Sequence, residues 1–148
     1  MSQLVSKWNY PTTVRFGAGR IAELPEVLEA AGIRKPLFVT DPGLAKLPIV
    51  ADTLAVLDRA GVPYGLFSDV KPNPVHSNLV AGVEAYRAGG HDGVIAFGGG
   101  SALDLGKLVA FQQAVQHAPG ECAMRAAALQ GQVDLFGHRA LHSRCSAA

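Results

Sequence analysis

The sequence has few cysteines, little net charge and no long apolar run. Cys122 and Cys145 are the only cysteines among 148 residues, so a disulfide framework is not expected and a reducing cytoplasm is the expected location. A formal net charge of +1 gives no electrostatic footprint for nucleic acid or an anionic membrane. No stretch reaches transmembrane length, and the first residues lack the apolar core of a secretory signal. These absences exclude several classes of protein and select no function.

Apolar runs and helical patterns alternate between residues 12 and 111. Strands are expected at 12–17, 36–41, 63–70 and 93–100, and helices at 20–32, 47–61, 77–90 and 101–111. Pro25 is expected near the first position of its helix, because proline is tolerated there and not in a helix interior. The order predicts an α/β fold with a Rossmann-like parallel sheet and helices on both faces. Ligands of such sheets bind at the carboxyl ends of the strands.

The chain changes character after Phe111. The remainder is rich in alanine and glutamine, holds both cysteines and shows no clear strand. We therefore expect a dinucleotide-binding domain over residues 1–113 and a divergent tail over 114–148, irregular or helical, that is a frame-shifted or disordered extension. Asp134, His138 and His142 in the tail are spaced four apart, close to Cys145, and such spacing can bind zinc. Scattered histidines and cysteines in short tails usually bind nothing, so no metal ligand is expected.

Two glycine motifs follow predicted strands. The first, "GAGRIA" (17–22), matches the G-x-G-x-x-A dinucleotide fingerprint, and Asp41 ends the next strand at a suitable distance. Pro25 interrupts the helix that would hold the pyrophosphate, which weakens this interpretation, and the alternative is a strand-to-helix turn that simply needs glycine.

The second motif, "GGGS" (98–101), opens the helix expected from Ser101. Glycine lets the backbone approach a ligand, and Ser101 is a preferred N-cap, with Asp104 at capping-box distance. Free amides and the helix dipole at this point suit a pyrophosphate. The alternative is a tight turn with an ordinary cap.

"GGGSALDLGK" (98–107) resembles the G-G-G-S-x-x-D-x-x-K signature of the iron-type (group III) alcohol dehydrogenases. "FGAGRIAELPEVLEAAG", "LFVTDPGL" and "DVKPNPV" resemble N-terminal segments of that family in the same order. The resemblance implies an oxidoreductase domain that binds NAD for metal-dependent hydride transfer between an alcohol and a nicotinamide. It also implies that the pyrophosphate lies on the second motif, and that the first only begins the domain.

The resemblance assigns cofactor-binding roles to seven residues: Asp41, Asn73, Gly98, Gly99, Gly100, Ser101 and Asp104. The glycines and Ser101 would hold the pyrophosphate, and Asp104 would support their loop near the nicotinamide. Asp41 would accept hydrogen bonds from the adenosine ribose, which favours NAD over NADP. The alternative for Asp41 is a residue that caps a turn. The alternative for Asn73 is a turn residue that faces the solvent. We expect Lys107 to pair locally or to pack its aliphatic stem, and His76 and His91 to be solvated surface residues.

Members of this family are normally longer, with a second, helical domain whose aspartate and three histidines hold Fe²⁺ or Zn²⁺. No such set is recognisable here, so the chain is expected to be truncated before that domain, with no catalytic residue and no activity alone. An alcohol or aldehyde is the implied substrate, and a homodimer is a further implication. Three alternatives remain: a stand-alone nucleotide-binding module, a poorly folding fragment, and a relative of glycerol dehydrogenase or maleylacetate reductase.

Overall fold

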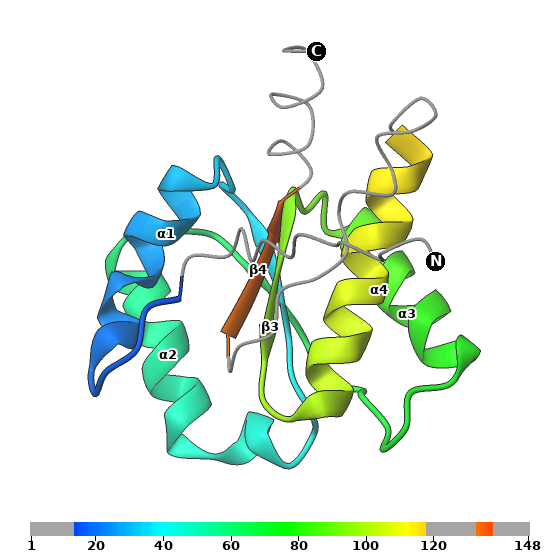
Figure 1. The fold of residues 1–148 in the computed structure, drawn as a ribbon, viewed down its shortest axis with the longest axis horizontal. Coiled ribbons are helices and arrows are strands. Elements are labelled where there is room, and N and C mark those ends of the chain that lie inside the picture. The colour runs from blue at the N-terminus through cyan, green and yellow to red at the C-terminus, as the bar shows by residue number, and fades with distance from the viewer. Residues whose placement is uncertain (1–13, 118–132, 138–148) are drawn as a thin grey trace, which may run out of the picture.

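The structure is a computed structural model that describes residues 14–117 and 133–137. Its elements are, in chain order, the 3₁₀ helix η1 (Arg20–Glu23), α1 (Leu24–Ala30), β1 (Pro36–Val39), the 3₁₀ helix η2 (Leu44–Lys46), α2 (Pro48–Arg59), β2 (Gly65–Phe67), α3 (His76–Ala88), β3 (Gly93–Phe97), α4 (Gly100–His117) and β4 (Val133–Gly137). They form three layers, with α1 and α2 on one side of the sheet and α3 and α4 on the other (Figure 1). The predicted α/β fold with helices on both faces is confirmed.

The sheet has the strand order β2-β1-β3-β4. Strand β1 pairs in parallel with both β2 and β3, with Phe38 opposite Leu66 on one side and Ile95 on the other. The chain therefore moves outward from β1 to β2 and then crosses back to the opposite side of β1 to form β3. The strand order reverses at this point, and the carboxyl ends of β1 and β3 flank the reversal.

Successive residues of β1 point into different hydrophobic layers. Phe38 packs with Ile95 of β3 against the buried faces of α1 and α2, and its ring lies 5.3 Å from that of Phe97. Leu37 and Val39 instead join the cluster formed with α3 and α4. All four residues of β1 and all five of β3 are buried, which explains their unbroken apolar sequence.

The approach of α4 to the sheet depends on Gly106. A Cβ atom at this position would lie 2.6 Å from the Cβ of Ala96, which is closer than two carbon atoms can pack. The helix therefore rests directly on β3 at this point. Fixing α4 against β3 also fixes the position of the turn that joins them.

The segment before α1 differs from expectation. Residues 14–16 form no strand, and Val14 and Phe16 are 76% and 92% exposed. The strand expected at 12–17 is therefore wrong for these three residues, because β propensity gives a strand only where a neighbouring strand can pair with it. The expectation for Pro25 is confirmed, because it lies in the first turn of α1.

The tail contains a strand that the sequence did not predict. Strand β4 pairs antiparallel with β3, with Val133 opposite Phe97 and Gly137 opposite Gly93. The expectation of a tail without a strand is corrected over these five residues, where Val, Leu and Phe supply some β propensity. Asp134 lies in β4, so it does not share a helix face with His138 and His142, as a spacing of four residues would allow in a helix. The two histidines and both cysteines lie outside the described residues, and the domain boundary near residue 113 stays a prediction.

Among the helices described, none combines the length and the apolar character required to cross a membrane.

Candidate functional site

Three of the predicted segments meet at the carboxyl edge of the parallel strands. Asp41 follows β1, Asn73 lies in the connection from β2 to α3, and the glycines at 98–100 join β3 to α4. Asp41 and the glycines thus lie at the reversal of strand order, where a crevice forms in doubly wound sheets. The fold brings together residues that the sequence keeps far apart.

The three consecutive glycines have different surroundings. Gly98 has a φ of +132°, and a Cβ there would lie 2.7 Å from Leu44 Cδ1 and 3.4 Å from Asp41 Oδ2. Gly98 is therefore required by its conformation and by the close approach of the segment after β1. A Cβ on Gly99 or Gly100 would meet nothing within 4 Å. Contacts among the described residues thus explain why residue 98 is glycine. They do not explain glycine at 99 and 100, which face open space.

The helix after β3 begins earlier than expected. Helix α4 starts at Gly100, and the amide of Leu103 donates to the carbonyl of Gly99 at 3.1 Å. Gly99 is therefore the N-cap, and the prediction of Ser101 as the cap is wrong, because Ser101 lies inside the first turn. The capping box with Asp104 is excluded for the same reason. The amides of Gly99, Gly100 and Ser101 are among the first four of the helix, counted from the N-cap, for which α-helical geometry provides no carbonyl partner. Such amides favour an anion.

The Asp41 carboxylate has two distinct environments. Its Oδ1 accepts hydrogen bonds from the amides of Gly43 at 3.0 Å and Leu44 at 2.9 Å, which caps the turn into η2. The turn-cap interpretation is therefore confirmed for this oxygen. Its Oδ2 faces Gly98 and makes no hydrogen bond to the described part of the chain. The cap holds the carboxylate in place and leaves the second oxygen available at the crevice.

Thr40, which precedes Asp41, was missed by sequence reasoning. Its side chain is fully buried, and its hydroxyl has no hydrogen-bond partner within the residues described. The backbone amide of Thr40 donates to the carbonyl of Phe67 at 3.0 Å and so extends the pairing of β1 with β2. A hydroxyl in an otherwise apolar strand was the available signal. The carboxyl end of β1 thus contains an unsatisfied polar atom beside the crevice.

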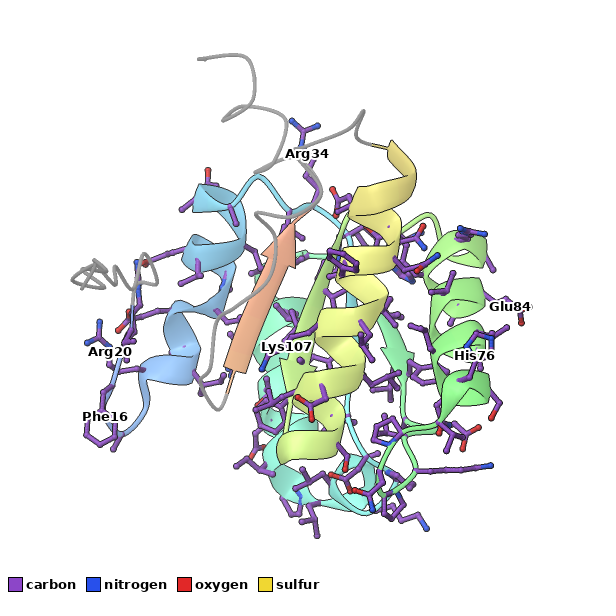
Figure 2. The ribbon with its side chains drawn as sticks, turned by 45° about the vertical axis from the view of Figure 1, so that its right-hand side comes forward. Phe16, Arg20, Arg34, His76, Glu84 and Lys107 are labelled. Atoms are coloured by element: carbon purple, nitrogen blue, oxygen red, sulfur yellow. The ribbon has the colours of Figure 1, made fainter. Side chains whose placement is uncertain are left out.

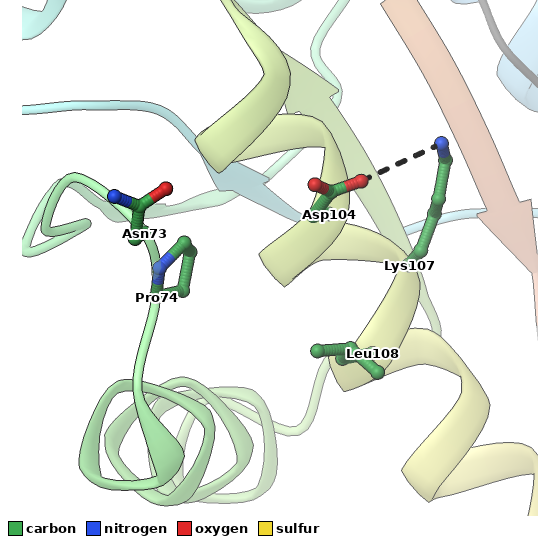
Figure 3. Close-up of a pocket in the computed structure, with 5 residues that line it drawn as sticks. All are labelled: Asn73, Pro74, Asp104, Lys107 and Leu108. Atoms are coloured by element: carbon green, nitrogen blue, oxygen red, sulfur yellow. Dashed lines mark ion pairs between the residues drawn. The ribbon is translucent and has the colours of Figure 1, made fainter.

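Asn73 and Asp104 line opposite walls of an open groove of about 470 Å³. Pro74 lies with Asn73 on the wall formed by the connection into α3, and Lys107 and Leu108 lie with Asp104 on α4 (Figure 3). Asn73 has a φ of +51°, a left-handed conformation that asparagine tolerates better than most residues. Lys107 Nζ lies 3.9 Å from Asp104 Oδ1, which confirms its predicted local pairing.

The first glycine motif lies elsewhere and is engaged in local contacts. Arg15 and Arg20 both bind Glu23, at 2.6 Å and 2.8 Å. The hydrogen bond from Arg20 is the main reason that the pKa of Glu23 lies below its usual range. Figure 2 shows Phe16 and Arg20 on the turn before α1, away from α4 and its Lys107. The dinucleotide fingerprint needs a strand before its glycines, and residues 14–16 form none. This motif is a turn.

The two histidines differ from each other. His76 is exposed at the start of α3, as expected. His91 is only partly exposed, and its Nδ1 lies 3.1 Å from the carbonyl oxygen of Lys35. The ring fills a notch against Gly65 and Gly89, where a Cβ would collide with it. Burial lowers the pKa of His91, so its expected role as a solvated surface residue is wrong.

The first turn of α4 offers a place for an anion. The open space at Gly99 and Gly100 and the amides of the first turn of α4 form a cradle for a phosphate group. Over residues 14–117 and 133–137, no group of three or more His, Cys, Asp or Glu side chains could hold a metal ion.

The fold and the open glycine turn define a Rossmann-like α/β domain. A family model described as iron-containing alcohol dehydrogenase matches residues 11–134. The chain therefore belongs to the iron-containing alcohol dehydrogenase family.

Individual relatives agree with this assignment. A choline dehydrogenase of Bacillus subtilis is 36% identical over 99 residues, which are 67% of this chain and 25% of the relative. The NADH-dependent butanol dehydrogenase A of Thermotoga maritima superposes with a TM-score of 0.68 at 34% identity, over 82% of this chain and 30% of that one. A sulfoacetaldehyde reductase of Bifidobacterium kashiwanohense, solved with NAD⁺, superposes with a TM-score of 0.62 at 29% identity, over 79% and 33%. The chain thus spans about a quarter of the length of the first of these relatives.

Proposed function

We propose that this chain binds a nicotinamide dinucleotide across the carboxyl edge of its sheet, with the pyrophosphate at the N-terminus of α4. The observation that carries the proposal is the open space in front of Gly99 and Gly100, beside the amides of the first helical turn. No packing contact among the described residues requires glycine at these two positions. A phosphate oxygen in this space would accept hydrogen bonds from those amides and benefit from the helix dipole.

The residues around the cradle suit the two halves of the ligand. Asp41 Oδ2 would accept hydrogen bonds from the adenosine ribose hydroxyls, while Oδ1 keeps the carboxylate in place through Gly43 and Leu44. A carboxylate here would repel a 2′-phosphate, so the proposal favours NAD over NADP. The other half of the dinucleotide would enter the groove between Asn73 and Asp104.

The proposed reaction is hydride transfer between an alcohol or aldehyde and the nicotinamide, as family membership and the names of the relatives suggest. When bound, the nicotinamide ring supplies the hydride acceptor or donor. The residues of this chain would anchor and orient the dinucleotide. We also propose that these 148 residues do not turn over substrate alone, because the described part contains no group of metal ligands to activate the alcohol.

A thermal-shift titration of the 148-residue chain with NAD and NADP tests the proposal. A ligand at about 100 times its Kd should stabilise the fold by about 2.7 kcal/mol. NAD should give a shift that grows with its concentration in this way, NADP a smaller one, and Gly99→Val should abolish both because its side chain fills the cradle. Ala88→Val adds similar bulk at an exposed helix end on the opposite edge of the sheet, and should leave the shift unchanged. The absence of a shift with millimolar NAD would overturn the proposal.

A stand-alone nucleotide-binding module is the second candidate, favoured by the presence of a cradle without a metal-ligand group in the described residues. An assay of NADH formation from short alcohols, with Fe²⁺ or Zn²⁺ added, separates the two candidates once binding is shown. A longer polypeptide that contains this segment should be active if the oxidoreductase proposal holds. Binding without activity in that longer form would support the module.

A further inference from the structure

An ion pair forms part of the wall of the groove that leads away from the glycine cradle. Asp104 and Lys107 lie one turn apart on α4, with Lys107 Nζ 3.9 Å from Asp104 Oδ1 (Figure 3). The Asp104 side chain is 69% exposed, whereas that of Lys107 is 25% exposed. The carboxylate is thus well exposed on the wall of the groove, and the ammonium group lies beside it, on the side away from Asn73 (Figure 3).

The two ends of the proposed ligand must occupy opposite sides of the sheet. Asp41 leads into η2 and α2, which belong to the layer on one face. The groove lies between the connection into α3 and the first turns of α4, in the layer on the other face. A dinucleotide whose pyrophosphate lies on the glycines between them sends one nucleoside to each side. With the adenosine at Asp41, the nicotinamide enters the groove beside Asp104.

We propose that the Asp104–Lys107 pair sets the relative affinity of this site for the oxidised and the reduced dinucleotide. This inference rests on the proposed binding of a nicotinamide dinucleotide. The oxidised ring carries a positive charge and the reduced ring is neutral, while the rest of the ligand is the same. Asp104 attracts the charged ring alone, and Lys107 reduces that attraction by compensating the carboxylate. Lys107 therefore acts through Asp104 as a positioning and charge-balancing residue.

Among the described residues that line the groove, Asp104 and Lys107 carry the only charges. Its other lining residues, Asn73, Pro74 and Leu108, are uncharged. Because Asp104 is well exposed, water weakens the interaction, and each substitution should change the affinity ratio about two- to fivefold. For the same reason the change should diminish as ionic strength rises from about 0.05 to 0.5 M.

The test measures dissociation constants of the 148-residue chain for NAD⁺ and NADH, by calorimetry and NADH fluorescence. Lys107→Met should tighten NAD⁺ about two- to fivefold relative to NADH, and Lys107→Arg should keep the wild-type ratio because it keeps the charge. Asp104→Asn should shift the ratio in the opposite direction. Lys35→Met removes a lysine from the amino edge of the sheet and should leave the ratio unchanged.

The possible outcomes separate the two proposals. A shift in the ratio for Lys107→Met and its reverse for Asp104→Asn, both diminished at high salt, support the inference. Equal weakening of NAD⁺ and NADH in both variants would show that the pair only supports the helix, and would overturn this inference while leaving dinucleotide binding intact. A wild-type chain that binds neither form would overturn the proposed function and this inference with it.

Discussion

Asp41 and Gly98 pack against each other where β1 and β3 end, with Asp41 Oδ2 3.4 Å from the position that a Cβ on Gly98 would occupy. On another side, the same Cβ would lie 2.7 Å from Leu44 Cδ1. The turn after β3 is therefore fitted to the turn after β1, and the two form one surface. This contact separates the structural role of Gly98 from the proposed ligand-binding role of Gly99.

Gly98→Ala should destabilise the fold by about 1–3 kcal/mol, because the added methyl group collides with Leu44 and the residue must keep a φ of +132°. Gly99→Ala should cost less, because its Cβ points into open space. Denaturant unfolding of the two variants without ligand measures the difference. Equal losses would show that the close approach of the two turns does not determine the role of Gly98.

Asp41→Asn and Asp41→Ala separate the cap of η2 from the charge at the crevice. Asparagine can still accept the two hydrogen bonds at Oδ1, so its stability should stay close to wild type. Alanine loses both bonds and should cost about 1–3 kcal/mol. Both variants should reduce the preference for NAD over NADP in the thermal-shift titration. A variant that keeps the full preference without the carboxylate would assign the selection to another group.

His91 should make stability depend on pH on the acid side of neutrality. Burial, the largest cause, and the charge of Lys35 lower its pKa in the folded chain, and the hydrogen bond to the Lys35 carbonyl and the charge of Asp92 act in the opposite direction. The unfolded chain, with a histidine pKa of about 6.5, therefore takes up the proton first as pH falls. The stability contribution of neutral His91 is present above that pH and is lost as pH falls through the lower folded pKa.

Measuring the free energy of unfolding from pH 8 to pH 5 tests this expectation. The acid-side loss should be smaller in His91→Gln than in wild type. His76→Gln changes an exposed histidine and should keep the wild-type pH dependence. An identical profile for His91→Gln would show that the protonation of His91 does not contribute to the pH dependence of stability.

Gly106→Ala should destabilise the chain by about 1–3 kcal/mol, although alanine favours helix over glycine by roughly 0.5–1 kcal/mol. The collision with Ala96 Cβ at 2.6 Å outweighs the helix preference. Ala96→Gly in the same chain removes that carbon and should restore part of the stability. Thermal unfolding of the single and double variants provides the comparison, and a stabilised single variant would contradict the close contact of α4 with β3.

The sequence predicted the parallel part of the fold well, because buried parallel strands have an unmistakable composition. The runs around Phe38 and Ile95 are apolar on both faces, and glycine or proline marks most of the turns between the elements. The positions of Asp41 and the glycines at strand ends followed from this order, since strands of one direction end at one edge. Their mutual contact could not be predicted, because it depends on how the side chain of Leu44 packs.

The errors arose where a residue's role depends on distant partners. Serine is a residue type that often caps helices, which suggested Ser101 as the N-cap. The helix instead begins at Gly100, because the glycine before it, Gly99, also serves as an N-cap. Phe16 has β propensity without a neighbouring strand among the described residues. His91 looked like a loop residue, and only the fold places the carbonyl of Lys35 and the notch at Gly65 beside it.

The strand order has a consequence for how the cradle forms during folding. Its two sides come from β1 and β3, and the chain between them contains η2, α2, β2 and α3. The contact between Asp41 and Gly98 therefore closes a long loop and cannot form in an early, local step. A ligand that bridges the two sides binds only chains in which this closure has occurred. The apparent nucleotide affinity would thus report the fraction of molecules in which β1 and β3 have paired, and a dinucleotide added during refolding would favour that long-range pairing and not the individual helices.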